Sequence, residues 1–109
     1  IGGIGSVDAA NWYTVGTDSN GITWSIDNDS VKKDDKKAVM DIKAMDYEGY
    51  HYIVTEEFNH KKREVKDLKV TLYNPQGYVV KEEQVNKNSR KVEPGTPAYA
   101  VFQLIWGGK

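Results

Sequence analysis

Thr96-Pro97-Ala98-Tyr99-Ala100-Val101-Phe102-Gln103-Leu104-Ile105-Trp106-Gly107-Gly108 is the stretch that decides the fold of this chain. We predict a helix here, because Thr96 can act as N-cap, Pro97 suits the first helical position and Gly107 suits a left-handed exit. Apolar residues recur at helical spacing between these signals, namely Ala98, Val101, Phe102, Ile105 and Trp106. A helix this short is marginal alone. The rest of the chain must therefore supply a surface against which it packs.

The segment before this helix begins with the pattern of a β-hairpin. Trp12 to Thr17 is rich in strand-forming residues, and Asp18-Ser19-Asn20-Gly21 is a typical turn sequence. The next residues alternate with a period of two, which places Ile22, Trp24 and Ile26 on one face. The polar residues Thr23, Ser25 and Asp27 are then expected on the opposite, open face.

Further strands follow along the chain. Residues 28–37 are polar and are expected to form an exposed tip. Strands are predicted at Ala38 to Ala44, Tyr50 to Phe58, Val65 to Tyr73 and Tyr78 to Gln84, with Asn74-Pro75-Gln76-Gly77 as a turn. Ala38 to Ala44 has helical propensity, but seven residues are short for an isolated helix, so we predict a strand with Ala38, Met40, Ile42 and Ala44 inward. The predicted Val65 to Tyr73 strand has Leu68, Val70 and Leu72 on one side and Val65, Asp67 and Tyr73 on the other.

These elements predict an α+β fold. Consecutive short strands with hairpin-length links indicate an antiparallel, meander-like sheet of about six strands. The C-terminal helix is expected to pack on one face, with the other face open. We expect a flexible tail at residues 1–10, which looks like an added or processed end, and a single domain at residues 11–107.

Composition excludes several classes of function. Fifteen basic and sixteen acidic residues give a net charge of −1, so no global field favours nucleic acid. There is no cysteine, which removes thiolate chemistry and disulfides. No apolar run approaches the roughly 20 residues of a membrane span.

No motif in the chain predicts catalysis, a metal or a cofactor. His51 and His60 are the only histidines and lack metal-ligand spacing. Neighbouring residues on a strand face opposite ways, so Glu56-Glu57 and Glu82-Glu83 are expected to be exposed surface charge rather than catalytic dyads. We therefore predict a protein that is not an enzyme, with no catalytic, metal-binding or cofactor-binding residues.

Two groups of side chains are candidates for an interaction surface. The aromatic residues Trp12, Tyr13, Tyr73 and Tyr78 lie on or beside predicted strands, where they form either a binding face or ordinary cross-strand packing. Lys61, Lys62 and Arg63, together with the basic stretch 87–91, form either a patch for acidic partners or a solvated face.

The order of several motifs resembles the bacterial surface-adhesin E-like domain family. Trp12 leads the first strand and Ile22-Thr23-Trp24-Ser25-Ile26-Asp27-Asn28-Asp29-Ser30 follows the first turn. Arg63 precedes a strand ending at Tyr73, then come the turn 74–77 and Val92-Glu93-Pro94-Gly95-Thr96 before the helix. The resemblance spans nearly all of residues 11–106. It implies a small cell-envelope protein with an antiparallel sheet and a C-terminal helix, although family members often have cysteines that this chain lacks.

We therefore expect a non-enzymatic, extracytoplasmic binding or interaction domain, at the periplasm or cell surface. The signal peptide that such a location requires is not visible in this chain. The expected partner is a host or envelope protein, or a second copy through the open sheet face, without nucleic acid or a membrane span. One alternative is a small-molecule or haem carrier using Tyr47, Tyr50, His51 and Tyr52, because His and Tyr ligate haem iron. Another is a purely structural envelope module.

Overall fold

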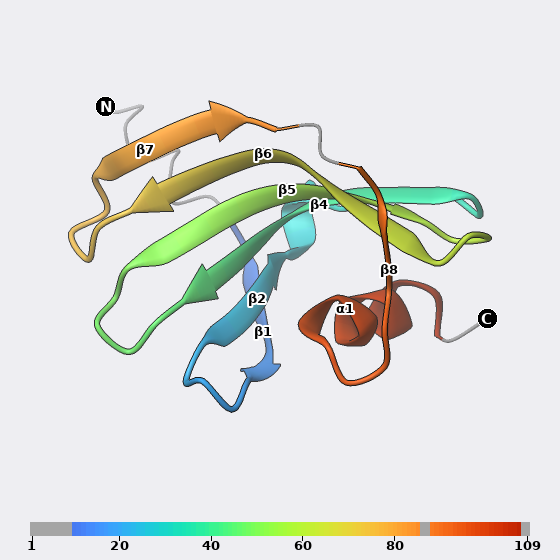
Figure 1. Ribbon diagram of the computed structural model, residues 1–109, viewed down its shortest axis with the longest axis horizontal. Helices are drawn as coiled ribbons and strands as arrows, with labels where there is room; N and C mark the ends of the chain where they lie inside the picture. Colours follow the sequence, from blue (N-terminus) through green and yellow to red (C-terminus); the bar gives the residue numbers. More distant parts are fainter. Residues whose placement is uncertain (1–9, 86–87, 108–109) are drawn as a thin grey trace.

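The computed structural model describes residues 10–85 and 88–107. Within them, one antiparallel sheet is covered on part of one face by a single helix, which confirms the predicted α+β fold (Figure 1). Except for Ala10, the predicted N-terminal tail lies outside the described residues.

The sheet follows a meander with two short additions. Its strands are β1 (Trp12–Thr17), β2 (Thr23–Asp27), β3 (Lys32–Lys33), β4 (Lys37–Met45), β5 (His51–Asn59), β6 (Glu64–Tyr73), β7 (Val79–Gln84) and β8 (Arg90–Lys91). The long strands lie in the order β1-β2-β4-β5-β6-β7, while β3 pairs with β4 and β8 pairs with β6. A 3-10 turn, η2 (Asn28–Ser30), lies between β2 and β3. The strand β8, which is not predicted from the sequence, is thus an addition before α1.

The helix α1 (Pro97–Trp106) has the predicted boundaries. The Thr96 hydroxyl oxygen accepts a hydrogen bond from the Tyr99 backbone N–H at 3.2 Å. At the other end, Gly107 adopts φ of 64°, and its N–H donates to the Gln103 carbonyl at 2.7 Å. These caps satisfy backbone groups that every helix end leaves without an intrahelical partner.

The core lies between α1 and the concave side of the sheet (Figure 1). Its buried apolar residues are Ile26, Ala38, Met40, Ile42, Phe58, Val65, Val101, Phe102 and Ile105. The inward positions predicted for β4 are confirmed, because Ala38, Met40 and Ile42 are buried and Ala44 is partly buried. The sheet therefore buries the apolar face that makes the short helix stable.

A bulge in β6 overturns the single alternation predicted for that strand. Thr55 pairs with Lys69 but Glu56 pairs with Asp67, so Leu68 is the extra residue. Because an extra residue reverses the side on which the following side chains lie, Val65 and Asp67 face the helix side while Tyr73 lies on the opposite side. The prediction that these three share one face is wrong.

The predicted exposure of the β2 polar residues is also wrong for Ser25 and Asp27. Ser25 is 4% exposed and Asp27 is 9% exposed. An Asp27 carboxylate oxygen accepts hydrogen bonds from the backbone N–H groups of Asn11 at 2.9 Å and Asp29 at 3.0 Å. Asp27 thus fixes the start of β1 and caps η2, which requires burial that the alternating pattern alone does not indicate.

Candidate functional site: a groove beside the helix

A groove of about 470 Å³ opens between α1 and the sheet. Its walls are mainly apolar, with Trp24, Ile42, Ala44, Tyr52 and Val54 from the sheet and Pro97, Ala98 and Val101 from the helix region. The chain around β8 crosses the sheet to reach α1 and adds the charged end of the groove (Figure 1). We call this space the groove. It exists because α1 has only ten residues and covers part of a long sheet face.

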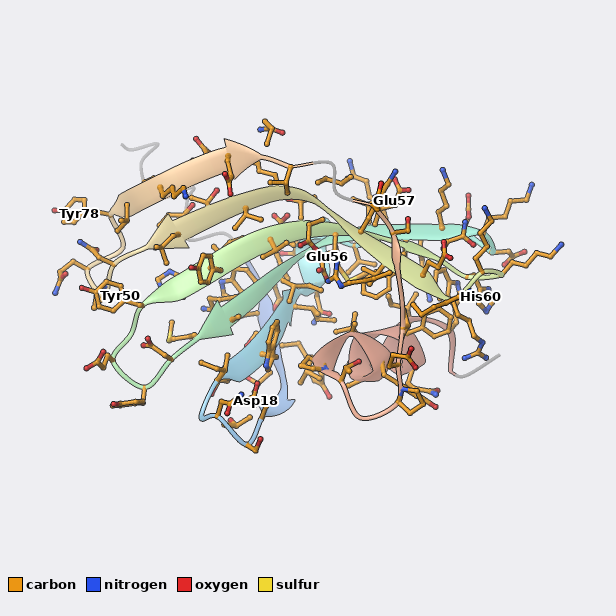
Figure 2. The ribbon with its side chains drawn as sticks, in the orientation of Figure 1. Asp18, Tyr50, Glu56, Glu57, His60 and Tyr78 are labelled. Atoms are coloured by element: carbon orange, nitrogen blue, oxygen red, sulfur yellow. The ribbon has the colours of Figure 1, made fainter. Side chains whose placement is uncertain are left out.

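The charged end of the groove is built from three strands. Arg90 on β8 donates through Nη2 to Glu56 Oε2 on β5 at 2.9 Å, and through Nη1 to Asp67 Oδ1 on β6 at 3.2 Å. Glu56 is only 8% exposed, and Figure 2 shows it above the space beside α1. One guanidinium is therefore shared by two carboxylates that face each other across neighbouring strands.

This arrangement changes the protonation of Glu56. Burial is the main cause that raises the pKa of Glu56 to about 8, and the neighbouring Asp67 raises it further while Arg90 opposes the rise. For Arg90, burial lowers the pKa, but Glu56 and Asp67 outweigh burial and raise it. The groove thus ends in a carboxyl group that is largely protonated at neutral pH.

Glu56 corrects the prediction that Glu56-Glu57 is exposed surface charge. Glu57 does point to the other side, where its carboxylate lies 3.9 Å from Lys37 Nζ. Glu56 instead occupies an inward position of β5, between Val54 and Phe58 on the helix side. The other inward positions of this row are apolar. The presence of a charged residue among them is the sequence signal that Glu56 has a functional or structural role.

The opposite sheet face, which we call the uncovered face, is lined by mutually paired polar groups. It carries a hollow of about 710 Å³. Thr55 Oγ1 donates to Asp41 at 2.7 Å, and Lys69 Nζ lies 3.1 Å from Glu82. Burial lowers the pKa of Lys43.

The predicted aromatic candidates do not form one surface. On the uncovered face, Trp12 lies under the Lys43 ammonium, 4.5 Å from the ring centre, and Tyr73 stacks on His51 at 5.1 Å. Tyr13 pairs with Ile26 of the core, so it lies on the helix side, 48% exposed. Tyr78 is 71% exposed at one end of the molecule (Figure 2). Only Trp12 and Tyr73 line the same hollow.

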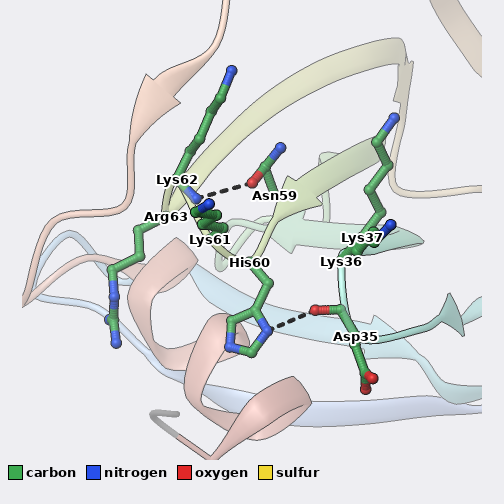
Figure 3. Close-up of a pocket in the computed structure, with 8 residues that line it drawn as sticks. All are labelled: Asp35, Lys36, Lys37, Asn59, His60, Lys61, Lys62 and Arg63. Atoms are coloured by element: carbon green, nitrogen blue, oxygen red, sulfur yellow. Dashed lines mark hydrogen bonds between the residues drawn. The ribbon is translucent and has the colours of Figure 1, made fainter.

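The basic candidates lie at the other end of the sheet, in the turn between β5 and β6. Lys61, Lys62 and Arg63 line a shallow cavity of about 680 Å³ with His60, and in Figure 3 the Lys62 side chain extends away from it. Arg63 lies 5.1 Å from the Phe102 ring centre, a cation–π contact. His60 stacks on Trp106 at 4.2 Å.

The second basic stretch does not present an unpaired patch. Arg90 forms ion pairs with Glu56 and Asp67, as described above. Lys91 Nζ donates to the Lys62 carbonyl at 3.0 Å and lies 3.6 Å from Glu64. Lys87 lies outside the described residues. Among the described residues of the stretch 87–91, Arg90 and Lys91 thus have acidic partners within the chain, although both side chains are half or more exposed.

The residues proposed for haem do not converge. His51 stacks on Tyr73 of the uncovered face, whereas Tyr52 lines the groove. Tyr47 is 88% exposed in the turn between β4 and β5. Within residues 10–85 and 88–107, no three acidic or histidine side chains are grouped to hold a metal ion. In the same part of the chain, no helix has the length and apolar character needed to cross a membrane.

Comparison with known proteins adds no family. No protein-family model, curated protein or solved structure matches this chain.

Proposed function

We propose that this chain is a non-enzymatic binding domain of the bacterial cell envelope, which holds part of a protein partner in the groove. The groove itself carries the proposal, because it combines apolar walls with a few placed polar groups at one end. Binding sites in proteins commonly have this composition. Trp24, Tyr52 and Arg90 are also residue types enriched where protein interfaces gain most of their affinity.

A comparison of the two faces of the sheet favours the groove, rather than the uncovered face, as the binding site. On the uncovered face, side chains such as Asp41, Thr55 and Lys69 already bond to one another, and a partner has to compete with those contacts. In the groove, Tyr52 is 47% exposed although its neighbours are apolar. Burial of such apolar area is the main source of association free energy. Homodimerisation through the uncovered face remains a separate prediction.

The envelope location and the adhesin-like role rest on the sequence resemblance of residues 11–106. The best-known members of the family that residues 11–106 resemble are adhesins that bind host matrix proteins, so we take extracellular-matrix proteins as the first partners to test. The fold provides an antiparallel sheet for such a role, and the groove provides a defined contact site on it.

The test is binding of the chain to immobilised extracellular-matrix proteins at physiological salt. We compare the wild type with Ala98→Trp, which fills the groove from the helix. Leu104→Trp is the matched control, because Leu104 is on the same helix, 50% exposed and outside the groove lining. The proposal predicts binding that Ala98→Trp abolishes and Leu104→Trp retains. Equal binding by all three proteins would contradict the groove, and no binding by the wild type would contradict the adhesin-like role.

A further inference from the structure

The charged end of the groove has a composition that selects among partners. Three acidic side chains (Glu56, Asp67 and Glu93) and two basic side chains (Arg90 and Lys91) line it, whereas α1 contributes only apolar lining residues. Lys91 contacts Glu64 and the Lys62 carbonyl. Arg90 is thus the cation in direct contact with Glu56, and it divides its guanidinium between Glu56 and Asp67.

The apolar and charged parts of the groove follow one another along a single strand. Tyr52, Val54 and Glu56 are alternate residues of β5, and all three line the groove. Alternate strand residues lie about 6.6 Å apart on one face. A partner side chain that lies along this row therefore meets apolar surface first and a buried carboxyl group at the end.

Lysine has the chemistry that fits this row. Its stem is an apolar chain of four carbons and its end is a compact ammonium with three hydrogen-bond donors. A partner carboxylate at the same place would meet two acidic side chains, Glu56 and Asp67, which share the single guanidinium of Arg90. A purely apolar chain would desolvate the Glu56 carboxyl group without bonding to it.

This inference rests on the proposed function of the groove. We propose that a lysine side chain anchors the partner, with its carbon chain on Val54 and its ammonium bonded to the Glu56 carboxylate. In the unbound protein a proton largely occupies Glu56 at neutral pH. The ammonium takes the place of this proton, so binding releases it to solvent.

The test uses the peptide acetyl-Gly-Leu-Lys-Leu-Gly-amide and two matched peptides, with Nζ-acetyl-lysine or glutamate in place of lysine. Each is titrated into ¹⁵N-labelled protein near pH 7, and the groove resonances are followed by NMR. We expect the lysine peptide to bind at least roughly tenfold more tightly than either matched peptide. We expect Glu56→Gln to reduce that preference to about twofold or less, because glutamine keeps the shape and cannot become a carboxylate. Calorimetry in phosphate and in Tris should show release of about one proton for the lysine peptide.

The outcomes separate this inference from the proposed function. The lysine anchor would be overturned if the lysine and acetyl-lysine peptides bound with equal affinity. If Ala98→Trp abolished the binding of both peptides, the groove would still be a binding site. A preference for lysine that Glu56→Gln leaves unchanged would overturn the role of Glu56. No shift of groove resonances with any of the three peptides would overturn the anchor and count against the groove.

Discussion

Arg90 Nη2 lies 2.9 Å from Glu56 Oε2, although the two residues are 34 positions apart in the sequence. This contact joins the last short strand, β8, to the middle of β5. From β8 the chain continues across the sheet toward α1. The same contact places a buried carboxyl group at the end of an apolar groove. Stability, and the ligand binding that we propose, therefore depend on one small cluster.

The first prediction concerns pH and follows from Glu56. Its pKa is raised from 4.5 to about 8 in the folded protein, so between these values the folded state holds a proton that the unfolded state has lost. The contribution of Glu56 to the free energy of unfolding is fully present below pH 4.5 and is lost as the pH rises through 8. Glu56→Gln, which stays neutral, should remove this loss and be more stable than the wild type near pH 9 by about 1–3 kcal/mol.

Urea unfolding of both proteins near pH 5 and near pH 9 measures this difference. Subtracting the free energy of unfolding of the variant from that of the wild type cancels the contributions of the titratable groups that the two proteins share. Parallel pH profiles for the two proteins would contradict the raised pKa of Glu56.

The second prediction concerns Arg90. Arg90→Gln removes the cation shared by Glu56 and Asp67, so the pKa of Glu56 should rise further. Because the Arg90 side chain is 50% exposed, solvent screens the pair, and the expected loss of stability near pH 7 is about 1 kcal/mol. Lys69→Gln is a matched control, since it breaks an exposed pair with Glu82. A Glu56 pKa unchanged by Arg90→Gln would show that the contact is not formed in solution.

The third prediction concerns the packing of the helix. Phe102 is 1% exposed and contacts His60 and Trp106 ring to ring. Phe102→Ala should lower the free energy of unfolding by about 3–5 kcal/mol, because it leaves a cavity between α1 and the sheet. Leu104→Ala, on the exposed side of the same helix, should change it by about 0.5 kcal/mol or less. Chemical denaturation of both variants measures the difference, and equal losses would mean that α1 does not dock by this face.

The fourth prediction concerns the start of the helix. Thr96→Ala removes the oxygen that accepts from the Tyr99 N–H, and it should cost about 1 kcal/mol. Thr96→Ser keeps the oxygen and should stay close to the wild type. Thermal unfolding followed by circular dichroism compares the two variants, and equal melting temperatures would argue against the cap.

Local patterns in the sequence predict most of the fold. The caps at Thr96 and Gly107 define α1, and the alternation of Ala38, Met40 and Ile42 gives the correct inward face of β4. These features are short-range, since each depends on residues within one turn or one strand. Local information is sufficient for them.

The candidate site depends on long-range pairing and could not be derived in this way. The bulge at Leu68 brings Asp67 opposite Glu56, and the pairing of β8 with β6 brings Arg90 to both. No local sequence pattern predicts either the bulge or the pairing of β8 with β6. Glu56 interrupts the apolar row of β5, but from the sequence it is predicted to be exposed surface charge, and only the strand register shows its partners.

The most direct test of the central claim is the pKa of the Glu56 carboxyl group, measured by ¹³C NMR with Glu56→Gln to assign the resonance. A groove that ends in a buried carboxyl predicts a pKa of about 8 in the unbound protein, which falls when the lysine peptide saturates the groove. A pKa near 4.5 without ligand would contradict the account, because Glu56 would then be a solvated surface carboxylate.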